Sequence, residues 1–380
     1  MSGTSSAQAT AGFSNQTVRN IIYTSVGGDK LRVQVSNTFG STPLTVTNVS
    51  VGVVLDGAEL LPGTSRALTF AGKRSVTIAA GAQVLSDPLS MRVRPLEELA
   101  ISLYLPTATG PATNHSLSQQ TNYLATGNHA GDTAATAYTT TTGSWYFADG
   151  LDVRSGTATG TVVAFGDSIT DGYQSETGSN ARWPNYLARR LDALLGNAAP
   201  GVVDEGISGN RILNNSSCFG VSALSRFERD ALSQPGVKSV ILLEGINDIG
   251  MAGSPDSGCS APNNANVTPG QIEAGYRALI KMAHARGVRI YLGTLTPFAE
   301  SNPTYGGYYG TAYGERLREA VNNWILTSSG FNGVVNFAKV TQDPGNPQYL
   351  NPVYNSGDSL HPGDLGYEAM ADAIPLRFVR

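Results

Sequence analysis

The chain has 380 residues, of which 41% are hydrophobic and only 14% are charged, and its formal net charge is −4. This length is too great for one ordinary domain, and the apolar fraction is large enough for a sizeable core, which excludes a disordered chain. Because the sequence has no basic run, nucleic acid is not an expected partner. Because no stretch approaches the roughly 20 apolar residues of a membrane helix, we expect no membrane span.

Residues 1–10 have neither the basic segment nor the apolar segment of a secretory signal peptide. A cytoplasmic location is one interpretation. The composition, however, is rich in Gly, Ser and Thr and poor in Lys, which is typical of secreted proteins. We therefore expect an extracellular protein whose signal peptide is absent from this chain.

Residues 1–158 predict an all-β domain. Segments such as "LRVQVSNTF", "SVTIAA" and "LAISLYL" alternate apolar and polar residues, and turns rich in Gly, Pro, Asn and Asp separate them. In the last segment Ile101 and Leu103 point to one side and Ser102 to the other. Short antiparallel strands at this spacing favour a β-sandwich of the jelly-roll type, which we expect to be an accessory domain.

Residues 159–380 change to strands that alternate with helices. The predicted strands cover residues 161–165, 201–207, 239–243, 289–293 and 333–337. The predicted helices include residues 182–196, 271–287 and 315–325, where apolar residues recur every three or four positions. Repeated strand–helix units predict a parallel sheet covered on both faces. Ligands of such sheets bind at the carboxyl ends of the strands, so the loops after the strands are the expected place for chemistry.

The first of these loops contains Gly166, Asp167 and Ser168, within "VVAFGDSITDGYQ". An ordinary turn serine is one interpretation. A phosphate-binding loop is another, but the segment has neither the GxGxxG nor the GxxxxGK[ST] pattern. The third interpretation is a nucleophile, which a tight turn after a buried strand would expose.

A serine nucleophile needs a base, and the sequence contains four histidines. Two of them lie in the predicted β domain, and His284 lies inside a predicted helix, where we expect a surface position. His361 follows the fifth predicted strand, and Asp358 precedes it by three residues. A turn at this spacing presents carboxylate and imidazole together, so that the acid orients the base toward the serine. Asp364 is the competing acid.

An acyl-transfer site also needs hydrogen-bond donors where negative charge develops. Gly209, in "EGISGNR", follows the second strand and can bring its backbone N–H close to a substrate. Asn247, in "EGINDIG", follows the third strand and offers a side-chain N–H. Each residue alone is also explained as a turn residue. Four loops that each supply a different part of one site favour a hydrolase.

The segments "GDSITDG", "GISGN", "GIND" and "DSLH" resemble, in this order, the four sequence blocks of the SGNH (GDSL-type) hydrolases. The resemblance implies that residues 159–380 form a catalytic domain, a three-layer α/β/α sandwich of the flavodoxin-like kind with a five-stranded parallel sheet. Residues 1–158 are similar to the β-domain of secreted, xylan-esterase-like members of the family.

The resemblance also assigns roles to five residues. It implies that Ser168 is the nucleophile, Asp358 the acid and His361 the base of the catalytic triad. It implies that the backbone N–H groups of Ser168 and Gly209 and the side chain of Asn247 form the oxyanion hole.

These features together predict a serine carboxylester hydrolase that forms an acyl-enzyme and requires no cofactor. A thioesterase or a lysophospholipase is an alternative of the same class, and a lipase is less favoured because no long apolar loop is visible. A catalytically silent carbohydrate-binding protein is the alternative from another class. The intact set of catalytic residues argues against it.

The loop after the fourth strand contains Tyr305, Tyr308 and Tyr309. Flat aromatic side chains near an active site suit sugar rings, although packing against a neighbouring helix explains them equally well. Together with the resemblance to xylan-esterase-like proteins, they lead us to expect short acyl esters as substrates, in particular acetyl groups on a plant polysaccharide or its oligosaccharides.

The two cysteines, Cys218 and Cys259, have no CxxC motif and no nearby histidine, so we expect no metal site there. They lie in the loops after the second and third predicted strands, which leave the same edge of the sheet. We expect a disulfide that holds these two loops in register.

Overall fold

The structure is a computed structural model that describes residues 7–379. The chain divides into two compact units, of which the first ends at Ala158 and the second begins at Thr159. Of the helices within the described residues, none is both long enough and apolar enough to cross a membrane.

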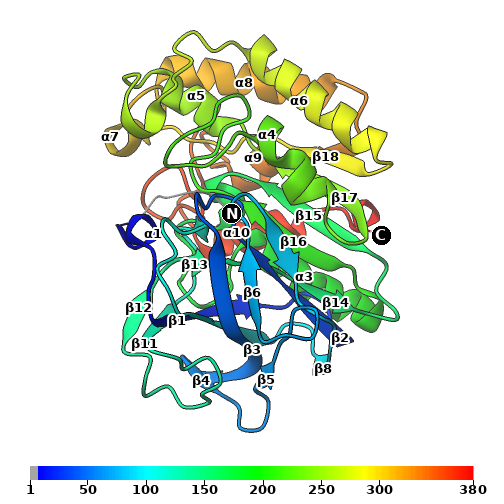
Figure 1. Cartoon of the computed structure of the whole chain (residues 1–380). Coiled ribbons are helices and arrows are strands. Elements are labelled where there is room, and N and C mark those ends of the chain that lie inside the picture. Colours follow the sequence, from blue (N-terminus) through cyan, green and yellow to red (C-terminus); the bar gives the residue numbers. More distant parts are fainter. Residues whose placement is uncertain (1–6, 380) are drawn as a thin grey trace. The chain divides into compact units, whose positions relative to one another are not determined.

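The first unit is built from antiparallel strands (Figure 1). Its elements are α1 (Ala7–Ala11), β1 (Gln16–Tyr23), β2 (Gly28–Ser36), β3 (Leu44–Asp56), β4 (Glu59–Leu60), β5 (Arg66–Ala67), β6 (Ser75–Ile78), β7 (Gln83–Leu85), β8 (Leu89–Val93), β9 (Glu98–Leu105), β10 (Asn114–His115), β11 (Asn122–Thr126), β12 (Thr140–Thr142), β13 (Trp145–Tyr146) and β14 (Ala148–Arg154). The larger sheet has the order β12-β11-β1-β9-β3-β4, and β5 and β6 also pair with β3. The smaller sheet has the order β14-β2-β7, with β8 paired to β2. The short helix α1 is an element that the sequence pattern does not predict.

The core of this unit joins residues of both sheets. Leu31 and Val33 of β2 and Ile101 and Leu103 of β9 belong to one buried apolar cluster. Ser102, between the last two, points to the opposite face of the larger sheet. The alternation of apolar and polar residues therefore predicted the two-sheet arrangement correctly.

The opposite face of the larger sheet is also covered. Arg19 of β1 is completely buried there, and its Nε donates to Oγ of Ser102 at 2.8 Å. Its guanidinium lies 4.0 Å from the centre of the Tyr138 ring and also donates to the backbone oxygens of Ala58 and Asp132. Burial lowers the pKa of Arg19. These contacts compensate in part for the loss of water around a buried cation.

The second unit contains a parallel sheet of five strands, in the order β16-β15-β17-β18-β19. The strands are β15 (Thr161–Gly166), β16 (Gly201–Gly206), β17 (Val237–Leu243), β18 (Arg289–Gly293) and β19 (Gly333–Val335). The five-stranded parallel sheet confirms the predicted fold class. The fifth strand ends two residues earlier than predicted, because the side chain of Asn336 accepts a hydrogen bond from the backbone of Lys339 and starts a helix.

Helices cover both faces of this sheet, with α6 and α8 on one face and α3 and α10 on the other (Figure 1). The α-helices are α2 (Ser168–Asp171), α3 (Trp183–Leu195), α4 (Ala223–Phe227), α5 (Ile246–Ala252), α6 (Pro269–Ala285), α7 (Asn302–Tyr305), α8 (Ala312–Thr327), α9 (Phe337–Thr341) and α10 (Asp364–Asp372). The three helices predicted from periodicity are α3, α6 and α8. Apart from α10, which covers the sheet and begins close to the helix start expected after Pro362, the shorter helices carry little periodicity, and the sequence pattern misses them.

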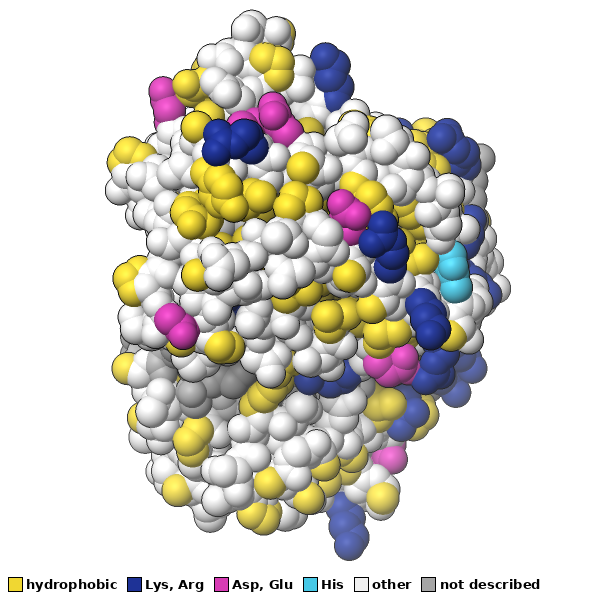
Figure 2. All heavy atoms as spheres, turned by 90° about the horizontal axis from the view of Figure 1, so that it is seen from above, with side chains coloured by type: hydrophobic (Ala, Val, Ile, Leu, Met, Phe, Trp, Pro, Cys, Tyr) yellow, Lys and Arg dark blue, Asp and Glu magenta, His cyan; other side chains and the backbone are white. Residues whose placement is uncertain are grey.

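The apolar strands of this sheet place short polar segments at their carboxyl ends. Gly166, Gly206 and Leu243 are neighbours in register across β16, β15 and β17, so the loops that follow them start at one edge. Figure 2 shows one face of the molecule, on which most side chains carry no charge, in agreement with the 14% of charged residues in the sequence.

Candidate active site

Ser168 lies at the point where β15 ends and the short helix α2 begins. The side chain of Asp167 caps this helix by accepting a hydrogen bond from the backbone N–H of Ile169 at 3.1 Å. Gly172 ends the helix in the left-handed conformation, with φ of 79°. Ser168 is thereby held at the carboxyl edge of the sheet, with 5% of its surface exposed.

Ser168, His361 and Asp358 form a continuous chain of hydrogen bonds. The distance from Oγ of Ser168 to Nε2 of His361 is 2.8 Å, and that from Nδ1 of His361 to Oδ2 of Asp358 is 2.7 Å. Oδ1 of Asp358 accepts the backbone N–H groups of Leu360 and His361 at 2.9 and 2.8 Å. Burial raises the pKa of Asp358, but the hydrogen bond and charge of His361 outweigh it and hold that pKa well below its usual range. An ionised Asp358 fixes the proton on Nδ1 and leaves Nε2 to accept from the serine.

The competing acid, Asp364, lies elsewhere. It is the first residue of α10, and its Oδ1 accepts the backbone N–H of Glu176 at 2.9 Å. His284 is exposed on α6, as predicted, and its Nε2 lies 3.3 Å from the side-chain oxygen of Asn332. Asp358 is therefore the acid that contacts His361.

Two backbone N–H groups near the serine are free to donate. Among the described residues, the N–H groups of Ser168 and Gly209 have no acceptor. The neighbouring Ser208 is fixed differently, because its N–H and its hydroxyl both donate to Asp171, at 3.1 and 2.6 Å. Gly209 has φ of 77°, and a Cβ atom there would lie 2.4 Å from the ring of Phe219. A glycine is therefore required at this position.

The side-chain amide of Asn247 is held at both ends. Its Nδ2 donates to the backbone oxygen of Asn210 at 2.9 Å, and its Oδ1 accepts the hydroxyl of Tyr309 at 2.5 Å. Because a backbone oxygen only accepts, this pairing identifies which end of the amide is nitrogen. One N–H of Nδ2 is left over. Gly250 allows the arrangement, since a Cβ atom there would lie 2.2 Å from the Tyr309 ring.

The three tyrosines predicted to contact a sugar differ in their positions. Tyr309 is only 4% exposed and its ring is packed near Phe298, so its contact with a sugar stays a prediction. Tyr305 is partly buried, and its hydroxyl donates to Oδ2 of Asp358 at 2.8 Å. Tyr308 packs edge to face against Tyr313. Packing, the alternative interpretation, thus explains at least Tyr309.

A buried arginine connects the strand ends beneath the serine. Arg226 of α4 is 0% exposed, and its guanidinium donates to the backbone oxygens of Gly166 and Glu205, both at 2.8 Å. Its Nε donates to the side-chain oxygen of Asn210 at 2.9 Å, and Nη2 lies 3.4 Å from a carboxylate oxygen of Glu244. The same side chain therefore touches the ends of β15 and β16 and the loop that follows β17.

Several buried carboxyl groups lie near this arginine, and Oδ2 of Asp230 is 3.5 Å from its Nη1. Burial, the largest cause, raises the pKa of Asp167 to about 7 and that of Asp248 to about 6, and it raises the pKa of Glu244 well above its usual range. Asp248 has a clear structural role, because it accepts the backbone N–H groups of Ile212 and Leu213 at 2.8 and 3.0 Å. One carboxyl oxygen of Asp167 and one of Glu244 have no partner among the described residues. Such groups are costly to ionise.

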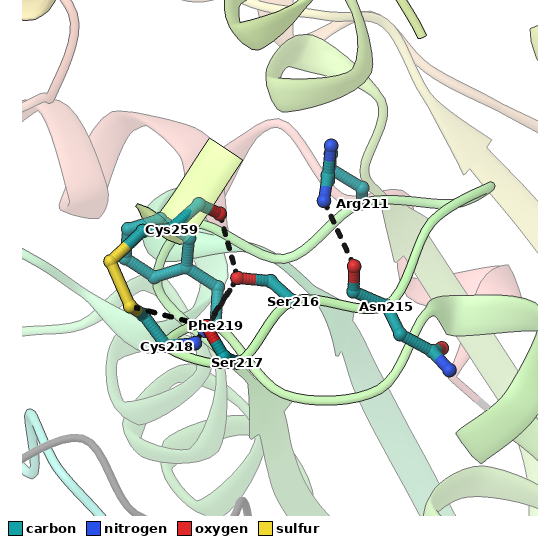
Figure 3. The surroundings of a disulfide bond; sticks show 7 residues. All are labelled: Arg211, Asn215, Ser216, Ser217, Cys218, Phe219 and Cys259. Carbon is teal, nitrogen blue, oxygen red and sulfur yellow. Dashed lines mark hydrogen bonds between the residues drawn. A yellow bond between two sulfur atoms is a disulfide. The ribbon is translucent and has the colours of Figure 1, made fainter. Parts of the chain in front are cut away.

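Cys218 and Cys259 form a disulfide, as predicted, with a sequence separation of 41 residues. Figure 3 shows Ser216 between the two sides of this bridge, where its hydroxyl donates to the backbone oxygen of Cys259 at 2.8 Å and accepts the N–H of Cys218 at 3.2 Å. Phe219, whose ring lies against Gly209, is the residue after Cys218. The disulfide thus holds the loop that carries Phe219 next to a candidate oxyanion donor.

Sequence reasoning missed several residues of this site. Arg226 lies in a segment without a clear period, and Asp171 was not singled out. Tyr173, whose ring centre lies 4.8 Å from that of His361, was not singled out either. Only the charge of Arg226 in an otherwise apolar, sparsely charged domain could have drawn attention to it.

Residues 164–369 match the GDSL-like lipase/acylhydrolase family. The match covers more than half of the chain, and the chain belongs to this family. The protein is thus a serine ester hydrolase of the SGNH type. No curated protein sequence matches the chain significantly.

Solved structures similar to the chain include further esterases. The aryl esterase of M. smegmatis has 15% identity and a TM-score of 0.44, and the likeness covers 58% of this chain and 100% of that one. An acetylxylan esterase from Geobacillus stearothermophilus has 21% identity and a TM-score of 0.39, covering 59% of this chain and 95% of that one. A GDSL-like lipase from Bacteroides thetaiotaomicron has 20% identity and a TM-score of 0.39, covering 57% and 87%. At these values the likeness does not extend to substrates.

The buried carboxyl of Asp167 makes stability depend on pH. An aspartate of the unfolded chain has a pKa of about 4, whereas burial raises the pKa of Asp167 in the native state to about 7. Between these values the native state binds more protons, so the free energy of unfolding falls as pH rises. We expect the Tm of the wild type to fall from pH 5 to pH 8 by about 2–5 °C more than that of Asp167→Asn, which keeps the capping oxygen. Parallel calorimetric Tm curves would contradict this assignment.

The disulfide is expected to contribute roughly 4 kcal/mol to stability, from the entropy of a closed loop of 41 residues. The double variant Cys218→Ser/Cys259→Ser should therefore unfold at lower denaturant concentration. Ser217→Ala, which alters the neighbouring exposed hydroxyl, is the matched control. Intact-mass analysis after alkylation without reductant should detect no modified thiol in the native protein. Two modified thiols would show that the bridge is absent.

Proposed function

We propose that Ser168 is the nucleophile of an acyl-enzyme mechanism, with His361 as general base and Asp358 as the residue that orients it. The hydrogen-bond chain from Ser168 through His361 to Asp358 is the observation that carries this proposal. Both links have lengths suited to proton transfer and orientation. The ionised Asp358 also stabilises the imidazolium that forms when His361 takes the serine proton.

The proposed reaction has two halves. His361 removes the proton of Ser168, whose oxygen attacks the ester carbonyl, and the imidazolium then gives this proton to the departing alcohol. In the second half His361 removes a proton from water, the resulting hydroxide attacks the acyl-enzyme, and the proton returns to Ser168 as the acid leaves. Atoms and charges balance with water as the only co-substrate.

We assign the oxyanion hole to the N–H groups of Ser168 and Gly209 and the free N–H of Asn247. The support is that both backbone donors have no acceptor among the described residues, and that Asn247 has one N–H left after pairing with Asn210. Donors that are fixed before the reaction stabilise a developing charge without reorganisation.

The triad assignment is tested by removing each member. We expect Ser168→Ala to abolish ester hydrolysis and to leave the Tm nearly unchanged. Asp358→Asn should lower kcat by about 10⁴-fold, because the imidazole then adopts the wrong tautomer. Asp364→Asn is the matched control and should retain kcat. If Asp364→Asn is the damaging change and Asp358→Asn is mild, a different acid orients the base.

We propose that the substrates are short acyl esters, in particular acetyl esters of plant polysaccharides or their fragments. The polar and aromatic surroundings of the triad support this proposal. Tyr173 and Tyr305 both pack edge to face against the ring of His361, and Gln174 lies 3.5 Å from Asp358. Aromatic faces with polar edges suit sugar rings better than long acyl chains. Contact of a sugar with Tyr305 or Tyr308 stays a prediction.

We further propose that the protein acts outside the cell, with residues 159–380 as the catalytic domain and residues 1–158 as an accessory domain. The disulfide between Cys218 and Cys259 supports an oxidising compartment, since such bonds persist there and are rare in the cytosol. An insoluble polysaccharide substrate would also require an extracellular enzyme.

A series of p-nitrophenyl esters tests the acyl preference. We expect kcat/KM to fall at least about 10-fold between acetyl or butyryl and octanoyl, because a small acyl pocket rejects a chain that extends beyond it. Acetylated xylo-oligosaccharides should release acetate. A rate that rises with chain length to octanoyl and beyond would favour the lipase or thioesterase alternative.

A further inference from the structure

The segment from α7 to residue 309 places two tyrosine hydroxyls on two different parts of the proposed active site. The hydroxyl of Tyr305 donates to Oδ2 of Asp358 at 2.8 Å, and that of Tyr309 donates to Oδ1 of Asn247 at 2.5 Å. The two rings are neighbours, with centres 5.7 Å apart. One short segment therefore contacts both the acid of the triad and the side-chain donor of the oxyanion hole.

We propose that Tyr305 and Tyr309 are positioning residues for catalysis. In this role Tyr305 limits the negative charge that Asp358 offers to His361, and Tyr309 holds the amide of Asn247 with its free N–H available to the oxyanion. This inference rests on the proposed function, and it gives these tyrosines a task other than sugar stacking.

The geometry at Asp358 supports the role proposed for Tyr305. Oδ2 is shared, because it accepts Nδ1 of His361 at 2.7 Å and the Tyr305 hydroxyl at 2.8 Å. Burial, together with the hydrogen bond to Asp358, raises the pKa of Tyr305 well above its usual range. The hydroxyl is therefore a neutral donor at every working pH. A carboxylate that already binds a second donor attracts the imidazolium less strongly than one that does not.

Two buried carboxyl groups near the site also titrate between pH 5 and pH 9, because burial raises the pKa of Asp167, beside Ser168, to about 7 and that of Asp248, beside Asn247, to about 6. Both are present in every variant compared below, so they do not account for a difference between variants. Tyr173, in the loop after α2, and Tyr305, at the end of α7, face the ring of His361, and Ser168 lies at Nε2. Tyr367 of α10 is buried, and burial raises its pKa well above the usual range. Asp358 is thus the charged group in direct contact with His361, so a change at its Oδ2 should be visible in the pH profile.

The geometry at Asn247 supports the role proposed for Tyr309. Its amide has one fixed acceptor, the backbone oxygen of Asn210, and one fixed donor, the Tyr309 hydroxyl. Asn247 is 3% exposed, so without the hydroxyl its Oδ1 would be buried and unpaired. A buried unpaired oxygen favours rotation of the amide, and rotation would misdirect the N–H that faces the substrate.

Conservative variants separate these roles from ring contacts. Tyr305→Phe and Tyr309→Phe remove only the hydroxyl and keep the ring, so any stacking on a sugar is preserved. Tyr313→Phe is the matched control, because Tyr313 is 42% exposed and its hydroxyl has no acceptor among the described residues. The assay is steady-state hydrolysis of p-nitrophenyl acetate from pH 5 to pH 9, with Tm measured for each variant.

We expect Tyr309→Phe to lower kcat about 10-fold with little change in KM, because the lost interaction acts only in the transition state. We expect Tyr305→Phe to shift the acidic limb of the kcat/KM profile upward by roughly half a pH unit, because Asp358 then favours the protonated imidazole more strongly. Tyr313→Phe should match the wild type. If both variants match Tyr313→Phe in kcat and in pH profile, or differ from it only in Tm, the proposal is overturned.

A readout without substrate separates this proposal from the proposed function. In protein labelled with ¹⁵N at histidine and asparagine, the Nδ1 proton of His361 should resonate at low field and disappear in Asp358→Asn. Tyr305→Phe should move this resonance, and Tyr309→Phe should move the side-chain amide resonance of Asn247. If the wild type did not hydrolyse esters, the proposed function would be refuted. If the resonances were unchanged in both variants, the positioning roles would be refuted.

Discussion

The arrangement of the loops at the carboxyl edge of the parallel sheet depends on one buried cation. The guanidinium of Arg226 has no contact with water, so its charge must be compensated by protein groups. It obtains this compensation from Asp230, whose carboxylate lies 3.5 Å from Nη1, and from the oxygens of Gly166, Glu205, Asn210 and Glu244. Strand ends that serve as ligands of one rigid, planar group cannot shift independently. The residues that follow them are consequently fixed relative to one another before any substrate arrives.

This order has an energetic cost that the rest of the domain must bear. The carboxyl groups of Asp167, Glu244 and Asp248 are buried around the arginine, and burial disfavours their charged forms. Two of them also hold backbone near the site: Asp167 caps the helix of Ser168, and Asp248 binds the loop beyond Gly209. Stability is given up for fixed geometry, as in many active sites. The packed helices on both faces of the sheet and the disulfide supply stability in return.

The sequence predicted the structure well where the residues that form a feature lie close together in the chain. The run of apolar residues before Ser168 and the spacing of Asp358 and His361 were sufficient to predict a strand, a turn and a Ser-His-Asp arrangement, which the geometry brings together. The sequence was less informative where a residue acts through long-range contacts. Tyr309 could not be distinguished from a surface aromatic because its acceptor, Asn247, is 62 residues away in the chain. The role of Arg226 depends on partners from the ends of β15 and β16 and from the segments that follow β16 and β17, and no local pattern records them.

Arg19 of the first unit determines where that unit could meet a ligand. Its guanidinium donates to the backbone oxygens of Ala58 and Asp132, and the ring of Tyr138 packs against it. The central strands of the larger sheet are therefore covered on their outer side as well as on the side of the core. Ser50 adds to this cover by donating to the backbone oxygen of Ala130. An extended polymer could bind across an exposed, flat sheet face. At these strands, however, other segments of the same chain cover that face. Recognition of a glycan by this unit would therefore have to use its loops or the edges of its sheets.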